Sequence, residues 1–112
     1  YMNRAYELMV IIDADVADAE NKVVVDRVEE LIGAAGGELS STDRWGRRKF
    51  AYLINHKAEG YYVVFEFTAD PAKLDPMDRF LRLADEVVRH KLIRLPEAEA
   101  ERRSLAAMAA ED

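Results

Sequence analysis

The basic and aromatic side chains of one short segment have the types and spacing of a nucleic-acid contact. Residues 44–52, RWGRRKFAY, place four cations and three aromatic rings within nine positions. Arg and Lys bind phosphate, whereas aromatic rings stack on bases or pack against other apolar groups. Residues 44–57 hold five basic residues and no acid, and residues 89–94, RHKLIR, add three more. We therefore expect these two segments to form the functional surface.

Charges on a strand at the edge of a sheet also have a structural use, because they block pairing with a strand of another molecule. The spacing in residues 44–52 fits both uses, and the second basic segment, on a different predicted strand, favours RNA contact. Trp45, Phe50 and Tyr52 offer apolar area of the kind that anchors a partner protein. The candidate RNA-contact residues are Arg44, Arg47, Arg48, Lys49, Lys57, Arg89, His90 and Lys91.

The overall charge is acidic, with a formal net value of −6 at pH 7. The acids concentrate in residues 13–30 and 97–112, away from the two basic segments. Cysteine is absent, which excludes disulfides and thiolate sites and fits a reducing compartment. No apolar run approaches the roughly 20 residues that span a bilayer, and no signal-peptide pattern begins the sequence. We expect a cytoplasmic protein without a membrane partner.

Motifs for catalysis, metals and cofactors are missing. His56 and His90 lie far apart and neither belongs to a HxxxH or HExxH pattern, so we predict no metal site. The sequence has no GxxxxGK[ST], GxGxxG or GxSxG segment, and we predict no cofactor, no small-molecule substrate and no reaction. An acylphosphatase-like enzyme is an alternative, and it requires a hydrolysis that substitution of an Arg abolishes.

Hydrophobic periodicity predicts six elements. Alternation predicts strands over residues 6–12, 38–54, 61–67 and 87–95, with a hairpin connection over 55–60. Helical spacing predicts one helix over residues 16–35, with Asp13 and Asp15 as candidate caps, and a second that follows Asp70-Pro71 or Asp75-Pro76 and ends near Asp85. Residues 1–96 form one domain, and residues 97–112 are an acidic, Ala-rich tail that we expect to be disordered.

The order strand, helix, strand, strand, helix, strand predicts an α+β, ferredoxin-like βαββαβ fold. Right-handed crossovers place both helices on one face of a four-stranded antiparallel sheet. The first and third strands are then central, and the two basic strands lie at opposite edges.

Several segments together resemble a known family. The run 46–54, GRRKFAYLI, followed by Gly60-Tyr61-Tyr62, is similar to the signature of the bacterial small-subunit ribosomal protein S-six (S6) family. Residues 4–7, RAYE, and 88–90, VRH, resemble the same family. The similarity covers about residues 2–95 in the right order, with Phe50 where the family usually has leucine.

The resemblance implies a structural protein that binds the central domain of small-subunit rRNA together with ribosomal protein S-eighteen (S18), on cytoplasmic ribosomes. It adds Arg4 and Tyr6 to the candidate contacts and supports Arg47, Arg48, Arg89 and Lys91. Tyr6 alternates in phase with Leu8 and Val10, which favours packing. The alternative is a ferredoxin-like regulatory or small-ligand-binding module that oligomerises through its sheet, and it predicts no salt-sensitive RNA binding.

Overall fold

The predicted order of elements is confirmed. The structure is a computed structural model that describes residues 3–54 and 56–96. A short 3-10 helix, Pro71–Lys73, precedes the second α-helix. The main elements are β1 (Arg4–Asp13), α1 (Asp18–Ala34), β2 (Glu38–Ile54), β3 (Lys57–Ala69), α2 (Asp75–Leu83) and β4 (Val87–Arg94).

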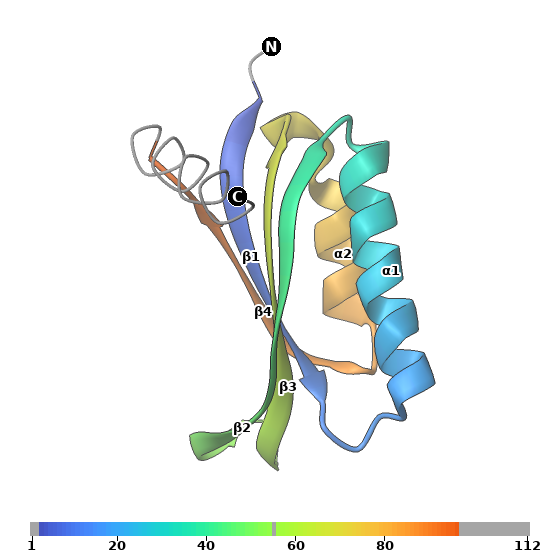
Figure 1. Ribbon diagram of the computed structural model, residues 1–112, viewed down its shortest axis with the longest axis vertical. Helices are drawn as coiled ribbons and strands as arrows, with labels where there is room; N and C mark the ends of the chain where they lie inside the picture. The colour runs from blue at the N-terminus through green and yellow to red at the C-terminus, as the bar shows by residue number, and fades with distance from the viewer. Residues whose placement is uncertain (1–2, 55, 97–112) are drawn as a thin grey trace, which may run out of the picture.

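The four strands form one antiparallel sheet with the order β2-β3-β1-β4. Both helices pack on the same side of this sheet (Figure 1). The predicted ferredoxin-like fold is therefore confirmed, with β1 and β3 central and the basic strands β2 and β4 at the edges. We call the sheet surface that α1 and α2 cover the helix face, and the opposite surface the open face.

The core lies between the helix face and the two helices. Alternate residues of β1 and β3 point into it, and Leu8, Val10, Val63 and Phe65 are fully buried. Tyr6 is also buried, and its ring lies 5.7 Å from that of Phe67, so packing is its role. The helices complete the core with apolar residues at helical spacing, which are Val24, Val25, Val28, Leu31, Ile32, Met77 and Leu81.

Three local predictions were wrong. The cap position of α1 is Ala17, with no side-chain hydrogen bond, and Asp13 Oδ1 instead accepts the N–H of Asp15 at 2.9 Å. The carboxylate of Asp13 therefore stabilises the turn before the helix. Asp70-Pro71 and Asp75-Pro76 each begin a helical segment as predicted, with Asp70 capping the 3-10 helix, but α2 ends at Leu83 and not near Asp85. The connection between β2 and β3 is shorter than predicted, since β3 already begins at Lys57.

Two further expectations concern the chain as a whole. The predicted tail, residues 97–112, lies outside the described residues. Within residues 3–54 and 56–96, neither α-helix has the length and apolar character needed to cross a bilayer.

Glycine is required where β3 passes closest to its neighbours. A Cβ on Gly60 would collide with Ile11 Cγ2 and lie 2.8 Å from Phe50 Cζ. A Cβ on Gly33, inside α1, would have no neighbour within 4 Å. The same substitution should therefore have opposite effects at these two positions.

We expect Gly60→Ala to lower the free energy of unfolding by about 1–3 kcal/mol, because overpacking forces neighbouring side chains to move. Gly33→Ala should leave stability unchanged or raise it by up to about 1 kcal/mol, because alanine favours helix. Urea unfolding of the two variants measures both values. Equal stability of the two variants would contradict the close packing at Gly60.

Candidate nucleic-acid interface

The pairing register decides which face each candidate residue occupies. Residues directly opposed in neighbouring strands share a face of the sheet. One row across the sheet consists of Gly46, Tyr62, Ile11 and Arg89. The next row on the same face consists of Asp43, Val64, Met9 and Lys91. These rows lie on the open face, because the row between them supplies the buried core.

That intervening row places two candidate residues on the helix face. It consists of Arg44, Val63, Val10 and His90. Arg44 Nη1 lies 3.4 Å from Oδ1 of Asn21 on α1, and His90 Nε2 lies 3.2 Å from Oδ1 of Asp78 on α2. The side chains of Arg44 and His90 therefore link the edge strands to the helices, and they lie on the opposite face of the sheet from the side chains of Arg89 and Lys91.

Two more candidate cations, one on each strand of the β2–β3 hairpin, form ion pairs. Arg47 Nη1 pairs with Glu59 Oε1 at 3.0 Å, and its Nη2 donates to the carbonyl of Ala14 at 3.0 Å. Lys57 Nζ lies 3.1 Å from Oδ2 of Asp13, with Asp15 at 3.7 Å. These contacts tie both hairpin strands to the end of β1 and the loop after it, and they partly neutralise the two cations.

The remaining candidate cations are more accessible. Arg48, Lys49, Arg89 and Lys91 are exposed, and none of them forms an ion pair within the described part of the chain. Arg4 is half-buried and pairs with Ala69 at the opposite end of β1 from the hairpin. The structure thus brings Arg48, Arg89 and Lys91 to the open face and leaves Arg4 apart from them.

Aromatic rings gather beside these cations on the open face. Trp45 and Tyr62 are nearly parallel with ring centroids 6.3 Å apart, and the tilted ring of Phe50 lies 6.2 Å from Tyr62. The guanidinium carbon of Arg48 lies 5.5 Å from the centre of the Trp45 ring. We call Trp45, Phe50 and Tyr62 the aromatic cluster. Tyr52 is 71% exposed and belongs to the same hairpin.

A β-bulge positions the tryptophan. The register of β2 against β3 shifts between Arg44 and Gly46, so that Trp45 is an extra residue, and Gly46 adopts a φ of 87°. Trp45 Nε1 donates to Oδ2 of Asp43 at 3.0 Å, which fixes the ring orientation. Tyr62 is not among the predicted site residues, although Gly60-Tyr61-Tyr62 belongs to the signature segment and Gly46 within a strand suggests a bulge and a close neighbour.

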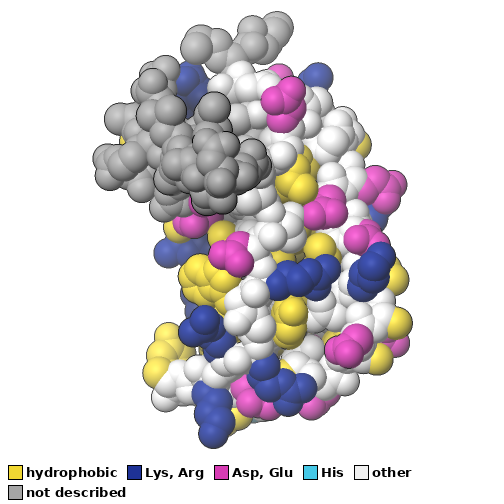
Figure 2. Space-filling view, viewed as in Figure 1, with side chains coloured by type: hydrophobic (Ala, Val, Ile, Leu, Met, Phe, Trp, Pro, Cys, Tyr) yellow, Lys and Arg dark blue, Asp and Glu magenta, His cyan; other side chains and the backbone are white. Residues whose placement is uncertain are grey.

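Basic and apolar side chains are adjacent on this part of the surface. Figure 2 shows Lys and Arg groups beside hydrophobic groups toward the lower left, on the side of the sheet away from the helices. This combination can bind phosphate and an apolar or planar group together.

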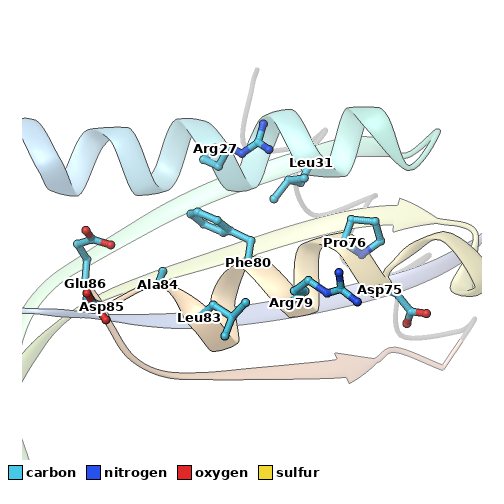
Figure 3. Close-up of a pocket in the computed structure, with 10 residues that line it drawn as sticks. All are labelled: Arg27, Leu31, Asp75, Pro76, Arg79, Phe80, Leu83, Ala84, Asp85 and Glu86. Carbon is cyan, nitrogen blue, oxygen red and sulfur yellow. The ribbon is translucent and has the colours of Figure 1, made fainter.

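A groove on the helix side has a different character. It has a volume of about 740 Å³ and lies between α1, α2 and the segment after α2 (Figure 3). Leu31, Phe80 and Leu83 form its apolar part, whereas Arg27 and Glu86 are among its charged residues. The residues that line it include no Ser, Thr or His that could serve as a nucleophile or base. Across residues 3–54 and 56–96, no cluster of His, Asp and Glu could hold a metal ion.

The contact between Asp13 and Lys57 changes the acidity of both groups. The backbone N–H of Asp15 is the main cause of the lowered pKa of Asp13, against a smaller opposing effect of burial, and Lys57 lowers it further. The carboxylate of Asp13 in turn raises the pKa of Lys57.

The chain is similar to proteins of known family. A family model described as Ribosomal protein S6 matches residues 5–94. A Small ribosomal subunit protein bS6 from Thermoanaerobacter pseudethanolicus is 40% identical over 94 residues, which are 84% of this chain and 99% of that protein. The bS6 of Carboxydothermus hydrogenoformans is 42% identical over 83% of this chain and 97% of its own length.

Solved structures agree in fold. The crystal structure of 30S ribosomal protein S6 from Thermotoga maritima superimposes with a TM-score of 0.84 at 33% identity, and covers 94% of this chain and 99% of its own. The C-terminal domain of the MgtC protein from Mycobacterium tuberculosis has a TM-score of 0.63 at 15% identity and shares the fold alone.

The Asp13 contacts predict a defined pH dependence of stability. A lowered carboxyl pKa stabilises the fold above the pKa of the unfolded chain, and this contribution disappears as pH falls through the folded value. The raised pKa of Lys57 contributes below about pH 10 and is lost above it. The difference in unfolding free energy between wild type and Asp13→Asn should therefore be constant from about pH 5 to 9 and shrink below about pH 4.

Urea unfolding at a series of pH values measures this difference. Glu30→Gln, on the exposed surface of α1, is the control for loss of one carboxylate. A difference that persists unchanged at the acid end would contradict a role of the ionised Asp13.

Proposed function

Because the chain belongs to the ribosomal protein S6 family, and is therefore a cytoplasmic, ribosome-associated protein of the small subunit, we propose that it binds the central domain of small-subunit rRNA together with ribosomal protein S18. The family is structural rather than catalytic, and we propose that this member catalyses no reaction. Membership also argues against the alternative of a regulatory or small-ligand module.

The observation that supports this proposal most is the composition of the open face. Arg48, Arg89 and Lys91 are exposed there beside the aromatic cluster, in rows set by the strand register. Cations supply phosphate contacts, and exposed rings supply the apolar area that anchors a protein interface. One face can therefore meet RNA and a protein partner side by side.

The need for a partner follows from the charge. The protein has a net charge of −6, and Arg47 and Lys57 are already paired with carboxylates of the same chain. Tight RNA binding usually requires many phosphate contacts. The accessible cations are too few for tight binding by this protein alone, and a basic partner would add the missing contacts.

The docking place that we propose for S18 is the outer part of β2. This strand is at the edge of the sheet, so one side of its backbone has no neighbouring strand within the described residues. Trp45 is 43% exposed and Tyr52 is 71% exposed on this strand, which gives a partner an apolar anchor.

Titration of a central-domain rRNA fragment tests the proposal. This protein alone should bind weakly, and this protein with S18 should bind tightly. Trp45→Ala should weaken the complex with S18 by about thirtyfold or more, because buried aromatic anchors contribute at least about 2 kcal/mol at interfaces. Tight binding of the fragment by this protein without S18 would contradict the need for a partner, and failure of both proteins together would contradict the function.

The contribution of single cations is measurable through salt. Arg48→Gln and Lys49→Gln should each reduce the slope of log affinity against log salt by about 0.7–0.9. Binding of a variant that lacks one phosphate contact releases fewer counterions. Lys22→Gln, an exposed residue of α1 that pairs with Asp26, is the matched control and should leave the slope unchanged. Filter binding at several KCl concentrations gives the slopes. Equal slopes in all three variants would indicate that the charges of β2 only prevent strand pairing.

A further inference from the structure

A second hollow lies on the open face, between the end of β2 and β4. It has a volume of about 280 Å³. We call it the open-face cleft, and it is lined by Met9, Ile11, Ile54, Tyr62, Arg89, His90 and Lys91.

An irregular segment of β2 forms one wall of the open-face cleft. Between Lys49, which pairs with Glu59, and Ile54, which pairs with Lys57, β2 has residues 50–53 where β3 has only Ala58. Surplus residues bend a strand, and the end of β2 turns toward the open-face side in Figure 1. This bend brings Ile54 close to the residues of β1 and β4 that line the open-face cleft.

The floor of the cleft is apolar and its β4 side is cationic. Ile11 is buried, although it does not belong to the core cluster under the helices, and Met9 and Tyr62 are half-buried. Arg89 and Lys91 are exposed and form no ion pair with any described residue. The cleft therefore suits a ligand that has a planar apolar part next to an anionic part.

We propose that the open-face cleft holds one unpaired nucleotide of RNA. Its base packs against Tyr62 and Met9, and its phosphate lies beside Arg89 and Lys91. This proposal rests on the proposed function, because it assigns a position to part of the rRNA. It also divides the open face, since the aromatic ring of Trp45 and the outer part of β2 remain for the protein partner.

Charge and shape select this occupant over others. The cations of β4 attract phosphate and would repel a basic protein such as the proposed partner. Bases inside an RNA duplex are stacked and paired, whereas an unpaired base can enter a pocket and stack on a ring. Glu7 and Glu66 form the next row of the open face beyond Met9 and Lys91, so the exposed cations Arg89 and Lys91 lie on the hairpin side of that row. The phosphate should accordingly lie toward the hairpin end.

Methyl NMR of the full chain tests the proposal directly. A short single-stranded RNA should shift the methyl signals of Met9, Ile11 and Ile54, and a duplex of the same length should not. The methyl signals of Val23 and Leu83, which are exposed on the helices, serve as internal controls and should not move.

Two variants separate base and phosphate contacts. Tyr62→Leu keeps an apolar side chain and should weaken binding of the single strand at least about fivefold, because stacking of one base on an aromatic ring contributes about 1–3 kcal/mol. Lys91→Gln, at an exposed position, should reduce the salt slope by about 0.7. Lys22→Gln on α1 is the matched control for the loss of a cation and should change neither value.

Three results would overturn the proposal. They are equal shifts of the cleft methyls with duplex RNA, an unchanged salt slope in Lys91→Gln, and shifts of the cleft methyls caused by S18 in place of RNA. If this protein and S18 together bind the central-domain fragment but the cleft methyls do not respond to it, the nucleotide site is wrong and the proposed function stands. If the two proteins fail to bind that fragment, the proposed function itself is wrong.

Discussion

The register of β1 against its two neighbours is the constraint on which the rest of this structure depends. Ile11 lies opposite Tyr62 on one side and Arg89 on the other, and Val10 lies opposite Val63 and His90. Because side chains alternate between faces, a slip of one residue would exchange the buried row for the cationic row. The burial of the core and the display of the cations are therefore set by the same backbone hydrogen bonds.

The edges of the sheet are held by polar contacts to the helices. On β2, Thr42 Oγ1 donates to Glu29 Oε2 of α1 at 2.6 Å, next to the contact between Arg44 and Asn21. On β4, His90 contacts Asp78 of α2. Exposed ion pairs contribute little stability individually, so we interpret these contacts chiefly as constraints on orientation. They explain why polar residues of a basic segment need not all be available to a ligand.

Charge is distributed along the open face as well as between the two faces. Glu7 and Glu66 occupy one row, and the cations Arg89 and Lys91 lie in the rows nearer the hairpin. A polyanion that approaches this face meets the exposed cations Arg89 and Lys91 toward the hairpin end. An acidic protein can in this way bind RNA at a limited area and in a preferred direction, while a net charge of −6 disfavours adhesion elsewhere.

The sequence by itself determined the order of the elements, the ferredoxin-like fold and the family, because hydrophobic periodicity and the signature around residues 46–62 are local properties of the chain. It also indicated that Tyr6 packs in the core.

Only the tertiary structure decided which cations share a surface. Arg44 and Arg47 are three residues apart, so strict alternation would place them on opposite faces, yet the extra residue Trp45 puts both on the helix face. The partners of Lys57 likewise come from the end of β1 and the loop after it. Bulges, strand register and ion pairs of this kind depend on pairing between segments that are distant in the sequence. A local sequence pattern therefore does not reveal them.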